Sequence, residues 1–198
     1  MLAILCTLVW LAGWAGEFAS ALPTSDYTPA SPAAHLPPAA QHYLQLALGQ
    51  FAHLSSYHLL LNLTALALLT WGLATHHSAR HWLLLSLFAL LAVPAYLLWT
   101  EPLQWYMGLS GALHAQFTAL LGLEILRPTH KGQCWHPQNA RTHWPLWVLV
   151  AGLGSKLALE WLNPPGFSAA LGGMVATQAH RGGVLVGLVW VGLFRRVG

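Results

Sequence analysis

Long runs of apolar residues, separated by shorter and more polar stretches, follow one another along the sequence. A helix needs about 20 predominantly apolar residues to cross the hydrocarbon core of a bilayer. Six runs meet this requirement: residues 2–21, 51–74, 82–99, 108–126, 144–162 and 171–194. The pattern predicts an all-α integral membrane protein, a bundle of six transmembrane helices in a single domain over residues 1–198.

Two of these runs need a closer look: the first could be a cleaved signal, and the third contains a proline. The first run is similar to a secretory signal but has no basic start and no polar cleavage region after a short apolar core, so we expect a retained helix. Pro94 should kink the third run or mark its last turn, because proline lacks an N–H and clashes with the preceding turn.

Composition supports the membrane interpretation. The chain is 56% hydrophobic and 7% charged, whereas a soluble domain carries about 25% charged residues. Its net charge of +3 is not gathered into a basic tract or an aromatic-interleaved patch, so nucleic acid is not an expected partner. The lipid bilayer is the expected partner.

Basic residues alternate between the segments that connect the runs. They occur at Arg80, Arg127, Lys131, Arg141, Arg195 and Arg196. Segments 22–50, 100–107 and 163–170 contain no Lys or Arg. Lys and Arg in short loops stay on the cytoplasmic side, so both termini are predicted to be cytoplasmic and segment 22–50 external, with an irregular, Pro-rich first half.

This topology sets the depth of a serine and a histidine. His180 lies about nine residues from the outer end of the sixth run, roughly 13 Å into a core about 30 Å thick. Ser110 lies at the start of the fourth run, so segment 101–107 must dip into the outer half of the membrane for the two to meet. A serine needs an adjacent base to attack a carbonyl, and histidine suits that role. The pair points to proteolysis inside the membrane.

Other polar and small residues fit the same site. His180, Gly183 and Gly187 share one helix face, and the two glycines form a GxxxG that lets helices approach closely. In the second run, His58 and Asn62 lie one turn apart and can donate hydrogen bonds to a developing oxyanion, close to His53. Each feature alone has a structural explanation, as small-residue packing or interhelical hydrogen bonding. Their coincidence in the outer half of the bundle favours catalysis.

Three segments carry a resemblance to a known family. Residues 58–62 read HxxxN, residues 108–111 read GxSG, and residues 179–183 read AHxxG. In order and spacing they are similar to the motifs of rhomboid intramembrane serine proteases, over about residues 49–187. The stretch from Trp105 to His114 resembles the rhombosortase branch, whose members process bacterial proteins that end in a Gly-Gly motif, an apolar helix and basic residues.

The resemblance implies specific roles. Ser110 would be the nucleophile and His180 the general base, without a carboxylate third member, and His58, Asn62 and the Ser110 backbone amide would stabilise the oxyanion. His53, Gly108, Gly111 and Gly183 would line or support the site. No cofactor or metal is implied. The expected substrate is a membrane-anchored protein with a C-terminal apolar helix, cut at a site that opens to the periplasmic side of the bacterial inner membrane.

Several positions depart from the family pattern or stand outside it. Many rhomboids have a Trp-Arg pair in the first external loop, where this chain has Leu44 and Gln45. Arg181 is a charge at a depth where insertion costs about 2.5–3.5 kcal/mol, so it needs a water cavity or a partner, Glu124 or Glu160. Lys156 and Glu160 can pair at i, i+4.

His114, one turn after Ser110, is either a cavity residue that tunes specificity or a hydrogen-bonded structural histidine.

Other classes stay open. The chain is also compatible with a general rhomboid protease acting on other single-span substrates, with a non-catalytic rhomboid-like protein that binds membrane clients, and with a carrier of metal or haem. The histidines of the cytoplasmic connections, including His77 and His81, are expected to be solvated. Cys134 and the histidines around it fit no standard zinc spacing, so no metal site is expected there.

Overall fold

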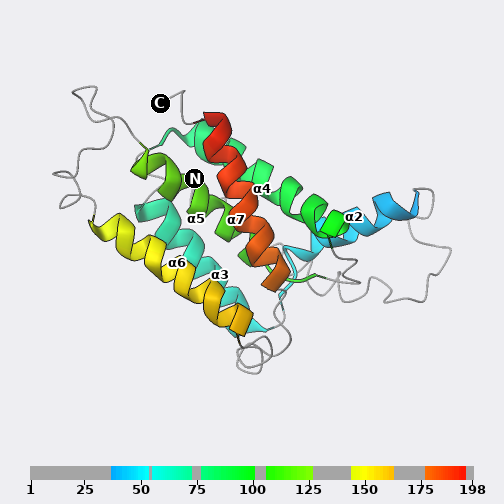
Figure 1. Cartoon of the computed structure of the whole chain (residues 1–198). Coiled ribbons are helices and arrows are strands. Elements are labelled where there is room, and N and C mark those ends of the chain that lie inside the picture. The colour runs from blue at the N-terminus through cyan, green and yellow to red at the C-terminus, as the bar shows by residue number, and fades with distance from the viewer. Residues whose placement is uncertain are drawn as a thin grey trace.

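The computed structural model describes residues 37–53, 55–72, 77–100, 106–126, 144–162 and 177–194. All regular structure in these ranges is helical, as the apolar runs predict (Figure 1). The helices are α2 (Pro38–Gly49), α3 (Ser56–Gly72), α4 (Ala79–Thr100), α5 (Ser110–Ile125), α6 (Trp144–Leu162) and α7 (Thr177–Phe194). The expected first run, residues 2–21, lies outside the described residues.

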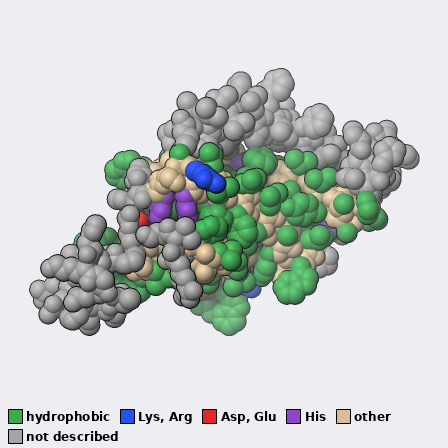
Figure 2. Space-filling model, turned by 90° about the horizontal axis from the view of Figure 1, so that it is seen from above, with side chains coloured by type: hydrophobic (Ala, Val, Ile, Leu, Met, Phe, Trp, Pro, Cys, Tyr) green, Lys and Arg blue, Asp and Glu red, His purple; other side chains and the backbone are tan. Residues whose placement is uncertain are grey.

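Two of the described helices, α4 and α6, are long and apolar enough to cross a membrane by length and composition. Large hydrophobic side chains are exposed along several helices, including Trp71 on α3, Leu87 on α4 and Leu159 on α6. In Figure 2 hydrophobic side chains cover much of the described part of one face, and histidines gather at one place beside an acidic group. These features fit a membrane protein.

Helix α5 lies at the centre of the bundle and packs against α3, α4, α6 and α7 (Figure 1). Its most extensive partner is α7, and the predicted GxxxG lies in that interface. An ideal Cβ at Gly183 would lie 2.1 Å from the carbonyl oxygen of Gly111, and one at Gly187 would lie 2.5 Å from that of Ala115. Only a residue without a side chain lets the two backbones approach this closely.

Pro94 lies inside α4, which continues to Thr100, so the proline does not end the helix. Proline has no N–H to donate to the carbonyl one turn earlier, that of Leu90. The Gln50 side chain donates to this carbonyl at 2.7 Å, and the Tyr43 hydroxyl donates to the neighbouring Leu91 carbonyl at 3.0 Å. The carbonyl that Pro94 leaves without a helical donor is therefore the place where the α2 region docks.

Helix α2 occupies the second half of the predicted external segment, for which the apolar pattern gave no transmembrane run. Pro38 begins it, at a position where the missing N–H has no helical partner to lose. The helix ends at Gly49, whose carbonyl accepts the N–H of Gly108 at 3.0 Å. α2 thus connects the Pro94 region to the segment that precedes Ser110.

The expectation of solvated loop histidines is wrong for His77 and His81. His81 lies within α4, and its Nε2 accepts the indole N–H of Trp190 on α7 at 3.1 Å. His77 Nε2 lies 3.3 Å from a carboxylate oxygen of Glu124 on α5. Both histidines are partly buried because they connect helices at the end of the bundle opposite Ser110.

Candidate active site

Ser110 is the first residue of α5, and the backbone before it is held from two sides. Gly108 has φ of 107°, a left-handed conformation that side chains disfavour. An ideal Cβ there would lie 2.5 Å from Cε1 of His58 and 3.5 Å from Nδ2 of Asn62. Glycine in the first position of GxSG is therefore required twice, by backbone conformation and by the closeness of α3.

Tyr106 supports the start of α5 from the other side. Its buried hydroxyl accepts the N–H of Gly111 at 3.1 Å, one of the donors that a helix N-terminus leaves without a helical partner. Burial raises the pKa of Tyr106 to about 12. The sequence assigned Tyr106 no role of its own beyond the stretch from Trp105 to His114. The available signal was a tyrosine four residues before the serine.

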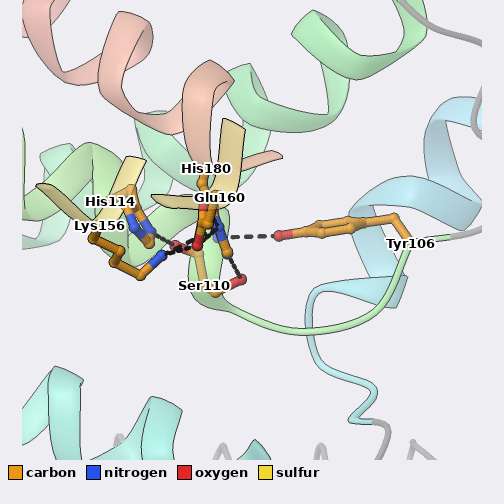
Figure 3. A network of polar contacts seen from close by, with 7 residues as sticks. Tyr106, Ser110, His114, Lys156, Glu160 and His180 are labelled. Atoms are coloured by element: carbon orange, nitrogen blue, oxygen red, sulfur yellow. Dashed lines mark hydrogen bonds and ion pairs between the residues drawn. The ribbon is translucent and has the colours of Figure 1, made fainter. Parts of the chain in front are cut away.

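The predicted nucleophile and base come together. The hydroxyl oxygen of Ser110 lies 2.8 Å from Nε2 of His180, which is buried at the fourth position of α7. Figure 3 shows Ser110 and His180 at the centre of a polar network drawn from three helices and the segment before α5. The close packing of α5 on α7 through Gly111 and Gly183 holds this distance.

The other nitrogen of His180 faces a carboxylate, where the family resemblance implied none. Nδ1 lies 2.9 Å from both carboxylate oxygens of Glu160 on α6. Lys156 forms the expected i, i+4 ion pair with Glu160, and its ammonium lies 3.3 Å from the same Nδ1. The signal available in the sequence was a carboxylate inside an apolar run, an expensive placement that points to function.

His114 packs directly on the histidine. Its Nδ1–H donates to the Ser110 carbonyl at 2.6 Å, and its ring stacks on that of His180 with centroids 4.3 Å apart and planes 20° apart. This geometry combines the two alternatives drawn from the sequence, because His114 is hydrogen-bonded within its own helix and also lies in the site.

His58 and Asn62 lie on one face of α3, both buried, and both face Gly108. Within the described part of the chain, Nδ2 of Asn62 and Nδ1 of His58 have no hydrogen-bond partner. The ring of His53 meets that of His58 edge to face, with centroids 5.2 Å apart, and its Nδ1–H donates to the Phe51 carbonyl at 3.1 Å. A buried amide donor beside the serine segment is suited to a developing negative charge.

Arg181 does not join this network. Its side chain is exposed on α7, although it follows His180 directly. Of the two partners considered from the sequence, Glu160 contacts His180 and Lys156, and Glu124 contacts His77. Arg181 is therefore placed at the surface rather than in the buried site.

The arrangement has the parts needed to attack a carbonyl. It combines a hydroxyl, an imidazole within hydrogen-bond distance and nearby amide and imidazole donors. In comparison with known proteins, the chain matches the family model described as Rhomboid domain over residues 40–197. No curated protein matches the chain, and no solved structure matches it.

Proposed function

The chain belongs to the rhomboid family of membrane proteins, and from this premise we propose that it is an intramembrane serine protease. The observation that carries the proposal is the distance of 2.8 Å between the Ser110 hydroxyl oxygen and Nε2 of the buried His180. A family member that only binds clients has no need of a serine and a histidine at this separation.

The proposed reaction begins with acyl transfer to Ser110. The hydroxyl oxygen attacks the scissile carbonyl carbon while Nε2 of His180 accepts the hydroxyl proton. When the tetrahedral intermediate collapses, the C–N bond breaks and the same proton passes to the leaving amine. Water then attacks the ester by the reverse sequence of proton transfers, which releases the acyl group and restores Ser110.

The oxyanion is proposed to lie near Gly108. The proposed donors are the backbone N–H of Ser110 and the side chains of His58 and Asn62, both of which face Gly108. A preorganised donor of this kind contributes about 2.7–4 kcal/mol to transition-state stabilisation. The unpartnered Nδ2 of Asn62 supports this assignment, since a buried amide with no partner among the described residues is otherwise costly.

The proposed setting is a six-span bundle in a bacterial inner membrane, with both termini cytoplasmic and the site open to the periplasmic side. The proposed substrates are exported proteins that carry a Gly-Gly motif and an apolar C-terminal helix, as in the rhombosortase branch. Glycine has weak helix propensity, so a Gly-Gly step would unwind and expose a carbonyl to Ser110 more readily than a step within a regular helix.

A fluorophosphonate probe tests the activity directly. Purified protein in detergent should label covalently, and Ser110→Ala and His180→Ala should abolish labelling. Ser155→Ala, which removes an exposed serine of α6, is the matched control and should label like wild type. Absence of wild-type labelling in a folded preparation would contradict the protease and favour a client-binding protein.

The substrate class needs a separate measurement. A reporter ending in Gly-Gly, an apolar helix and basic residues should be cleaved in membranes that contain wild type and not in those that contain Ser110→Ala. Replacing Gly-Gly by Leu-Leu should reduce cleavage strongly. Equal cleavage of both reporters would leave the protease intact and remove the sorting role in favour of a general rhomboid protease.

A further inference from the structure

A carboxylate completes a line of three polar groups across the bundle. Both oxygens of Glu160 lie 2.9 Å from Nδ1 of His180, and Nε2 of the same ring lies 2.8 Å from the Ser110 hydroxyl. The Glu160 side chain is only 14% exposed and has Lys156 as its ion-pair partner. The three groups come from α6, α7 and α5, so the line depends on tertiary packing and not on a local motif.

The contact with Glu160 determines which nitrogen of His180 carries the proton. A neutral imidazole has one N–H, and an ionised carboxylate can only accept. With the proton on Nδ1, the ring donates to Glu160 and presents the bare Nε2 to Ser110. The opposite tautomer would place a hydrogen on Nε2, where a general base needs a lone pair.

Lys156 sharpens this choice. Its ammonium can only donate, and at 3.3 Å from Nδ1 it would by itself favour the unproductive tautomer. In the structure the ammonium also forms an ion pair with Glu160. The Glu160 oxygens, at 2.9 Å, lie closer to Nδ1 than the ammonium does at 3.3 Å. Glu160 therefore favours the productive tautomer in two ways. It accepts the Nδ1–H of His180, and it forms an ion pair with Lys156, which would otherwise favour the other tautomer.

We propose that Glu160 is a positioning residue that makes the site a Ser110–His180–Glu160 triad. This inference rests on the proposed protease function and deepens it. As Nε2 accepts the Ser110 proton, the ring becomes an imidazolium whose charge the carboxylate stabilises through the Nδ1–H hydrogen bond. No proton moves to Glu160, and the proton on Nε2 leaves with the amine.

A purely structural role would have a different signature. Among its described residues α6 buries none, so the Glu160 contact could simply attach α6 to α7. Loss of an attachment would lower the stability of the fold or the affinity for substrate. Loss of a positioning group acts on kcat at saturating substrate, because it raises the barrier of the proton transfer without removing a substrate contact.

Steady-state kinetics on the full-length enzyme in detergent separates these roles. Glu160→Gln should lower kcat by up to about 10⁴-fold with little change in KM, the loss seen when a triad aspartate is replaced by its amide. Glu160→Asp, which keeps the charge on a shorter side chain, should recover part of the kcat that Glu160→Gln loses. Glu124→Gln is the matched control, because it neutralises a carboxylate remote from Ser110, and it should keep the wild-type kcat.

A measurement on the wild-type chain covers the case in which Glu160→Gln does not fold. In ¹⁵N-histidine-labelled protein the His180 signals, assigned by their loss in His180→Ala, should show a protonated Nδ1 and a bare Nε2. A protonated Nε2 with a bare Nδ1, or a wild-type kcat in Glu160→Gln, would overturn the triad. If Ser110→Ala retained activity, the protease proposal itself would fail. If Ser110→Ala and His180→Ala lost activity and Glu160→Gln kept the wild-type kcat, the triad alone would fail.

Discussion

At the scale of single residues, the site places aromatic side chains on two sides of the reacting pair. His114 covers one face of the His180 ring and also donates to the Ser110 carbonyl. Tyr106 accepts the N–H of Gly111, next to Ser110. Stacked and hydrogen-bonded neighbours restrict the rotamers of a reacting group, which is how a supporting shell keeps a site close to its productive geometry.

Tyr106 gives a prediction about alkaline pH. Burial raises its pKa to about 12, above the value of about 10 expected for an unfolded chain. The neutral phenol is therefore favoured by folding, and its contribution to stability is fully present below about pH 10 and is lost as the pH rises toward 12. A tyrosinate absorbance titration of folded protein should show one group ionising near pH 12.

Tyr106→Phe is the check on this assignment. The variant should lose the most alkaline step of the titration and leave the steps of the other tyrosines in place. It should also be less stable by about 1–3 kcal/mol, because the Gly111 N–H loses its buried acceptor. A titration curve unchanged by Tyr106→Phe would contradict the assignment.

At the scale of elements, the interface between α5 and α7 sets the distance between serine and histidine. Gly183 and Gly187 meet backbone carbonyls of α5, whereas an ideal Cβ at Gly192 has nothing within 4 Å. Gly187→Ala should therefore destabilise the protein by about 1–3 kcal/mol, because the new methyl group overfills the contact. Thermal unfolding in detergent measures the difference.

Gly192→Ala is the matched control on the same helix. It adds the same methyl group at an open position, and alanine has higher helix propensity than glycine by about 1 kcal/mol. Its unfolding temperature should equal or slightly exceed that of wild type. Equal effects of the two variants on the unfolding temperature would show that contact with the α5 backbone does not decide the effect at Gly187.

At the scale of the whole molecule, the charge pattern predicts which side of the membrane each connection faces. Cys134 lies in the basic connection between α5 and α6 and should react with a membrane-impermeant maleimide only when the cytoplasmic side is exposed. Ser168→Cys, placed in the connection without Lys or Arg before α7, should react from the outside, in a Cys6→Ser, Cys134→Ser background. Labelling of both positions from one side would contradict the proposed topology.

The sequence predicted those parts of the molecule that depend on spacing along one helix. The apolar runs located α3 to α7 within a few residues, and the i, i+4 spacing of His58 with Asn62 and of Lys156 with Glu160 placed each pair on one face. Helix rise and loop charge alone were enough to place Ser110 and His180 at depths where they can meet. The structure brings Ser110 and His180 together.

Features that depend on how one helix is rotated against another could not be predicted in this way. The contact of Glu160 with His180 depends on how α6 and α7 are placed against each other. Spacing along either helix does not determine that placement. Helix α2 was missed because it is too short to be read as a membrane run, and its docking depends on a carbonyl freed in α4. Solvation of His81 was predicted wrongly because α4 begins at Ala79, before its apolar run. Solvation of His77 was predicted wrongly because its contact with Glu124 depends on how α5 lies beside it.

The proline in α4 makes two distant positions interdependent. Gln50 matters because Pro94 leaves the Leu90 carbonyl without a helical donor. Gln50→Leu should therefore cost about 1–3 kcal/mol of stability in wild type and distinctly less in Pro94→Ala, where residue 94 can donate to that carbonyl itself. A double-mutant cycle of thermal unfolding measures this epistasis, and additive effects would refute it. A lineage that lost the proline would also lose the selection that keeps the glutamine.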